Sequence, residues 1–228
     1  MRGDVAMTIA EARAYSNGID FYVQSKKMTI QARREKDGSI SVRKTYDNPQ
    51  IEKTRYRFLI VAGFTVIATL LWKLVEDAAM SYKIIAVLVL AWLTAFGYFF
   101  ITSKISSNKS TFRYHAAEHK VLNYYMKHKS IPTTIEELAK EKSISFCCGS
   151  TVLTVVLLFA TIVGLILAFA PIWWVVLISV LVAAYVVLAM WANGYCDFLQ
   201  KYALLEPSKN ELEVALKGAE EYEKIKDK

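Results

Sequence analysis

The first 50 residues lack an apolar run of the kind that a secretory signal needs, so we expect the amino terminus to stay in the compartment where it was made. Histidine and cysteine are scarce, with three of each in 228 residues. The three cysteines fall in segments that we expect to face the cytosol, where thiols remain reduced. Cys147, Cys148 and Cys196 are therefore predicted to be thiols or metal ligands rather than disulfide partners.

Four long stretches lack almost all charge. The chain is 54% hydrophobic and 21% charged, so its apolar residues must be segregated. Crossing a bilayer takes about 20 apolar residues, which three stretches supply. The first is shorter and extends through Lys73, whose ammonium can reach the interface. We predict a mostly α-helical, polytopic membrane protein with four transmembrane helices in two helical hairpins, at 58–72, 84–103, 151–170 and 172–192.

The distribution of lysine and arginine predicts which segments face the cytosol. Twelve precede the first stretch, eight lie in the 104–150 loop and six follow Ala192. The other two connections hold only Lys73 and Lys83. The positive-inside rule then places both termini in the cytosol of a plasma-membrane protein. The net charge of +7 favours contact with the lipid bilayer over nucleic acid, because basic residues flank the spans instead of forming a separate domain.

The amino-terminal segment, 1–57, is expected to be cytosolic and to carry a β-hairpin. Polar and apolar residues alternate over 28–41, and Asp37-Gly38 supplies the turn. A hairpin alone is marginal in water. This one must therefore rest on the membrane surface or on the later cytosolic loop.

The remaining segments are a first transmembrane hairpin (58–103), a cytosolic helical loop (104–150), a second transmembrane hairpin (151–192) and a cytosolic tail (193–228). The loop is predicted to hold a helix at 112–127, capped by Ser110 or Thr111. A second helix, 135–142, follows the capping-box pattern Thr133-x-x-Glu136. The tail helix opens at Ser208-x-x-Glu211 and places Leu212, Ala215, Leu216 and Ala219 on one stripe.

Residues 114–120, Tyr-His-Ala-Ala-Glu-His-Lys, hold two of the three histidines. On a helix, positions i, i+3 and i+4 share a face, so His115, Glu118 and His119 should project together. Two imidazoles one turn apart can bind a divalent ion, and the carboxylate can act as ligand or base. The string matches the H-x-x-E-H pattern of inverted zinc peptidases.

Chain topology should bring further donors to these histidines. Cys148 directly precedes the third predicted span, and Asp197 follows the fourth. Thiolate and imidazole together favour zinc over magnesium or calcium. The alternative is that the histidines bind headgroups or backbone while the thiols are inert small residues. His128 lies between two lysines and is expected at the surface.

Several short segments of the chain resemble, in order, the sequence pattern of a known protein family. Residues 114–121 and Cys148-Gly149-Ser150 resemble the YqhQ-like membrane proteins of bacteria, catalogued as domain of unknown function 1385. Tyr195-Cys196-Asp197, Glu206-Pro207, Leu-Glu-Val-Ala at 212–215, and Gly18 with the hairpin resemble other elements of the family pattern, in the same order. The resemblance implies a metal-dependent enzyme of unestablished reaction, with His115, Glu118, His119, Cys148 and Asp197 at its site.

Two departures from that pattern leave two functions open. A family histidine falls near Ser145 and a family glutamate near Asn17, so two candidate ligands or bases are missing. The first hypothesis is a zinc-dependent hydrolase in which Glu118 activates water. The second is a non-catalytic accessory or scaffold that binds another membrane protein, with the metal structural or absent. A transporter is disfavoured, because the predicted span interiors lack acidic, basic and histidine residues.

Overall fold

The computed structural model describes residues 11–23, 26–46, 79–104, 106–145, 148–169 and 173–226. The first predicted transmembrane stretch, 58–72, lies outside them. The described elements divide into two units. The sheet unit holds four strands with helices α3, α4 and α8. The span unit holds α2 as far as Phe100 together with α5, α6, η2 and α7.

The sheet unit is built on a four-stranded antiparallel sheet in chain order. The predicted hairpin at 28–41 is confirmed, because the last two strands of the sheet pair with each other around this turn. Gly38 takes the positive φ of +85° that the turn requires. The sequence prediction missed the two strands that precede this hairpin. The second of them pairs with the first strand of the hairpin, and the first pairs with the second. The strands are β1 (Glu11–Tyr15), β2 (Gly18–Val23), β3 (Met28–Arg34) and β4 (Ile40–Thr45).

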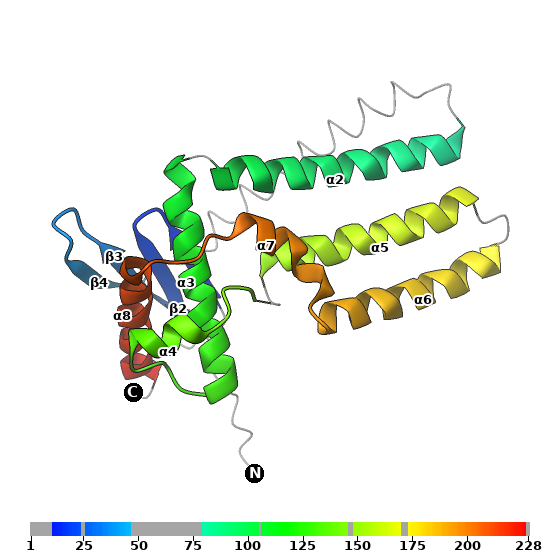
Figure 1. The fold of residues 1–228 in the computed structure, drawn as a ribbon. Coiled ribbons are helices and arrows are strands. Elements are labelled where there is room, and N and C mark those ends of the chain that lie inside the picture. Colours follow the sequence, from blue (N-terminus) through cyan, green and yellow to red (C-terminus); the bar gives the residue numbers. More distant parts are fainter. Residues whose placement is uncertain are drawn as a thin grey trace, which may run out of the picture. The chain divides into compact units, whose positions relative to one another are not determined.

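One face of the sheet is covered by α3 (Ser106–His128) and α8 (Lys209–Lys226) (Figure 1). Ile19, Phe21 and Ile30 are fully buried there. The predicted stripe of the tail helix, Leu212 to Ala219, joins this core. At Gly218 the helix approaches so closely that a Cβ would lie 2.4 Å from Cε2 of Phe21. The support that the hairpin needs therefore includes both helices.

Helix starts in this unit differ in detail from the prediction. Ser110 and Thr111 lie inside α3, so neither caps it, and Ser110 Oγ instead donates to the carbonyl of Ser16 at 2.6 Å. Helix α4 (Ile135–Lys140) is capped by Thr134, one residue later than predicted, because its hydroxyl accepts from the amide of Glu137. The capping box of α8 is confirmed, since the Ser208 amide donates to Glu211 Oε2 at 2.8 Å.

The span unit contains the long apolar helices. Helices α2 (Met80–Lys104) and α5 (Gly149–Phe169) are long and apolar enough to cross a membrane. After α6 (Trp173–Ala192) the chain bends by 76° into η2 (Tyr195–Asp197) and α7 (Phe198–Ala203), and this bent pair counts as a third crossing if it forms one span. The described residues thus contain two, or up to three, candidate membrane spans.

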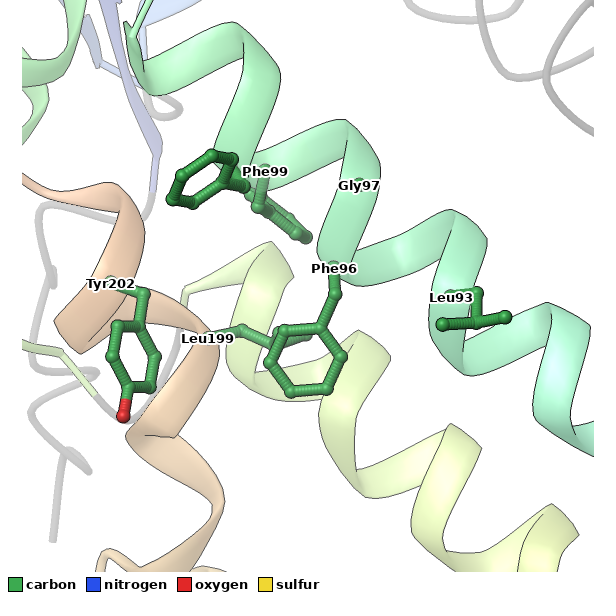
Figure 2. A pocket seen from close by; sticks show the side chains of 7 residues that line it. Leu93, Phe96, Gly97, Phe99, Leu199 and Tyr202 are labelled. Atoms are coloured by element: carbon green, nitrogen blue, oxygen red, sulfur yellow. The ribbon is translucent and has the colours of Figure 1, made fainter.

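Aromatic and polar contacts join the helices of the span unit. Trp92 Nε1 of α2 donates to Thr161 Oγ1 of α5 at 2.9 Å, and its ring stacks on Phe198 of α7. Beside this contact lies a hollow of about 580 Å³ (Figure 2). Its lining offers no imidazole, thiol or carboxylate, so it is not a metal site. The lining residues are Leu93, Phe96, Gly97, Phe99, Phe100, Leu199 and Tyr202.

Candidate metal centre

Helix α3 carries the two predicted histidines on consecutive turns of one face. The ring centroids of His115 and His119 lie 4.3 Å apart. Between them, Ala116 and Ala117 are fully buried, so this part of α3 packs closely against its neighbours. His119 is 2% exposed, while the His115 side chain is 31% exposed. His119 is therefore enclosed by its neighbours, while the His115 side chain remains accessible to solvent.

Each imidazole is oriented by an oxygen atom on its Nδ1. Nδ1 of His115 lies 3.0 Å from Oε2 of Glu118, and Nδ1 of His119 lies 2.8 Å from the carbonyl oxygen of Ser143. A carbonyl oxygen can only accept a hydrogen bond, and the same is true of an ionised carboxylate oxygen. Both Nδ1 atoms therefore donate. In a neutral ring the lone pair then sits on Nε2. Metal-binding histidines commonly have this arrangement.

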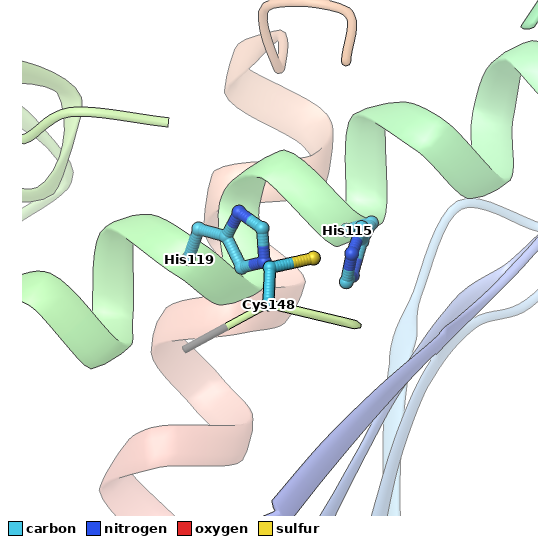
Figure 3. Close-up of side chains that lie close together, drawn as sticks. All are labelled: His115, His119 and Cys148. Carbon is cyan, nitrogen blue, oxygen red and sulfur yellow. The ribbon is translucent and has the colours of Figure 1, made fainter. Parts of the chain in front are cut away.

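Cys148 supplies a third donor. The ligand atoms of His115, His119 and Cys148 all lie within 4.8 Å of one another (Figure 3). Chain connectivity also limits how far the thiol can be from the histidines, since Cys148 is five residues beyond Ser143 and five residues span at most about 18 Å. His115, His119 and Cys148 are thus a candidate metal-binding group.

The other residues considered for this site lie elsewhere. Asp197 is outside the three-residue group, and its Oδ1 accepts from Thr151 at 3.4 Å within the span unit. His128 is 41% exposed, as predicted, and its ring packs on Tyr124. Cys147 lies outside the described residues. Cys196 is a buried, reduced thiol.

The two departures from the family pattern have different surroundings. Ser145 is buried at 1% exposure, two residues beyond the carbonyl that binds His119. Asn17 is exposed in the turn between β1 and β2, where its carbonyl accepts from the amide of Arg34 at 2.8 Å. Ser145 thus belongs to the segment that follows the carbonyl bound to His119, and Asn17 belongs to a turn at one end of the sheet.

Sequence reasoning missed a polar network behind His119. Lys120 is 3% exposed, and its ammonium lies 2.7 Å from Oε1 of Glu206. Burial opposes ionisation of Glu206, but hydrogen bonds from Lys120 and Ser143 outweigh it and lower the pKa of that carboxyl. Glu206 is therefore ionised at neutral pH. The only sequence signal was that Lys120 and Glu206 both belong to motifs that resemble the family pattern.

Comparisons with known proteins show the family of the chain. The profile of the family described as "Protein of unknown function (DUF1385)" matches residues 52–224. The chain belongs to this family. It is also similar to "Uncharacterized protein YqhQ" of Bacillus subtilis (strain 168), with 31% identity over 77 residues, which is 34% of this chain and 24% of that protein. The match thus spans about a quarter of that relative's length. No solved structure matches the chain.

The matched DUF1385 region contains the whole candidate group. Two imidazoles and one thiol form a donor set that suits zinc, which binds nitrogen and sulfur ligands in tetrahedral sites. Three protein ligands leave a fourth position, as in catalytic zinc sites. The side chains present therefore fit a bound metal ion.

Proposed function

We propose that this member of the DUF1385 family is an integral membrane protein that binds zinc through Nε2 of His115, Nε2 of His119 and the thiolate of Cys148. The observation that carries the proposal is the pair of oxygen acceptors on the two Nδ1 atoms, at 3.0 and 2.8 Å. They favour the tautomer whose Nε2 lone pairs are available to a metal. A thiol within 4.8 Å completes a zinc-type donor set.

We favour a three-ligand site over a closed one. Asp197, the fourth candidate ligand, is engaged with Thr151 and lies outside the group. Zinc held by three protein ligands lowers the pKa of a bound water to about 7 and so supplies hydroxide at neutral pH. The reaction class that this supports is hydrolysis. In that function the two histidines and Cys148 hold the ion.

A second candidate is a non-catalytic membrane component that binds another membrane protein through the sheet unit. The observation that favours it is the engagement of Glu118, whose Oε2 faces Nδ1 of His115 instead of standing apart as a base. A carboxylate in this position orients a ligand and raises its basicity. The non-catalytic candidate does not require a metal, and if zinc is bound the two candidates differ in whether a coordination position is open.

Purified protein in detergent should contain about one zinc ion per chain, because three ligands bind one ion. After cobalt replaces zinc, we expect a sulfur-to-cobalt charge-transfer band, and added azide should alter the visible spectrum by occupying an open position. Cys148→Ser should lose the band, while Cys196→Ser should keep it. A band that survives Cys148→Ser would overturn the ligand set, and a spectrum indifferent to azide would favour the non-catalytic function.

We further propose a plasma-membrane location with four spans and both termini in the cytosol, because lysine and arginine concentrate on the segments assigned to that side. Reporter fusions after Lys129 and at the carboxyl terminus should report the cytosol. A fusion within 78–82 should report the opposite side. Cytosolic signal from that short connection would contradict the four-span arrangement.

A further inference from the structure

A single segment, residues 139–144, supplies the carbonyl that orients His119, and side chains of α3 hold this segment along its length. Lys120 Nζ donates to the carbonyls of Ala139 and Glu141 at 2.9 and 2.6 Å. The next carbonyls along the chain are held by the amide of Asn123, which donates to Lys142 and Ile144, both at 2.8 Å. Only the Ser143 carbonyl, between those two, faces His119.

Every hydrogen-bond donor of the Lys120 ammonium and of the Asn123 side-chain amide has an acceptor. An ammonium has three donors and a side-chain amide nitrogen has two. The ammonium of Lys120 uses its three on Ala139, Glu141 and Glu206, and Asn123 uses its two on the segment. Burying a lysine is costly unless its charge is paired and hydrogen-bonded. A buried ammonium so fully engaged fixes the carbonyls that it binds.

Glu206, in the tail of the chain, binds both Lys120 and this segment. Glu206 pairs with Lys120 through Oε1, and its Oε2 accepts from the Ser143 hydroxyl at 2.7 Å. Ser143 is therefore held through its side chain by the tail, while its carbonyl neighbours on both sides are held by α3. Rotation of the Ser143 peptide away from His119 would break bonds at Asn123.

We infer that Lys120 and Asn123 are positioning residues that hold the Ser143 carbonyl on Nδ1 of His119 and so fix the His119 tautomer that presents Nε2 to the metal. The metal-binding part of this inference rests on the proposed function. The tautomer part does not, because it concerns a hydrogen bond present without any ion. Neither side chain belongs to the proposed ligand set.

The test compares Lys120→Met with Lys127→Met in the full-length protein. Methionine keeps an apolar stem of similar length and removes the ammonium. Lys127 lies on the same helix but is 65% exposed and reaches only the Glu141 carboxylate, at 3.2 Å. Two properties are measured: the imidazole ¹⁵N shifts of His119 in metal-free protein, which report the tautomer, and zinc affinity by competition with a chelator.

We expect Lys120→Met to shift His119 from the Nδ1-protonated form towards a tautomer mixture and to weaken zinc binding by roughly 10- to 100-fold, the range for partners that orient metal ligands. Lys127→Met should change neither property. If Lys120→Met does not fold, Asn123→Ala carries the same test, because it removes two hydrogen bonds and no buried charge.

The outcomes separate the inference from the function on which it rests. An unchanged His119 tautomer in the folded variant overturns the positioning role, whatever the zinc affinity. A shifted tautomer in a protein that binds no zinc, wild type included, supports the positioning role and rejects the proposed function. A lowered melting temperature alone, with tautomer and affinity intact, shows a purely structural role and also overturns the inference.

Discussion

Replacing either His115 or His119 by alanine is expected to reduce bound zinc to less than about a tenth of the wild-type content, because each change removes one of three ligands. The two ring centroids lie 4.3 Å apart with the ring planes tilted by 56°, and each ring supplies a separate ligand atom. Metal content is measured on protein purified without added chelator. No substitution that leaves the three proposed ligands in place should have so large an effect.

His128→Ala is the matched control for this experiment. The residue lies at the end of the same helix, is 41% exposed and stands 3.8 Å from Glu141 Oε1. Its loss should leave zinc content unchanged. Equal metal content in all three variants would remove the metal site from this helix altogether.

Glu118→Gln is expected to weaken zinc binding by roughly 10- to 100-fold, because the carboxylate orients His115 and makes it a stronger ligand. Glutamine keeps the shape and can still accept a hydrogen bond, but it lacks the charge. Zinc bound only to the folded state is linked to folding, so the melting temperature in zinc should fall as well. Chelator competition and thermal unfolding, with and without zinc, measure the two effects.

Glu136→Gln supplies the control, because it removes one carboxylate from the exposed first turn of α4. It should change neither affinity nor zinc-dependent melting. If Glu118→Gln retains full zinc affinity and loses a hydrolytic activity, Glu118 is a base rather than an orienting partner. That result would favour the catalytic function over the accessory one.

Local patterns were enough to predict part of this structure. The 3.6-residue period placed His115 and His119 on one face of α3, and the alternation over 28–41 predicted β3 and β4. The apolar stripe of α8 was likewise readable, since Leu212 and Ala219 are both buried. Each of these features depends on residues within a few positions of one another.

Contacts between distant residues could not be predicted in the same way. The bond from His119 to Ser143 spans 24 residues and uses a main-chain carbonyl, which every residue carries. Lys120 looks like a surface lysine in sequence, because its burial depends on Glu206, 86 positions later. Strand β2 was missed although Ile19, Phe21 and Val23 alternate along it. The contact between its Asp20 carboxylate and Arg33 of β3 joins separate strands and carries no local sequence pattern.

The sheet unit is assembled from three separated parts of the chain, which the ribosome makes at different times. Ribosomes make the amino terminus first, so the residues of β2 and β3 are made before every long apolar helix in the described part of the chain, whereas α8 is the last of the described helices to be made. Until then, Phe21 and Ala32 lack the helix that packs on them at Gly218, and Lys120 lacks Glu206. The histidine pair therefore acquires the contacts described here only after translation has passed the long apolar helices α2, α5 and α6.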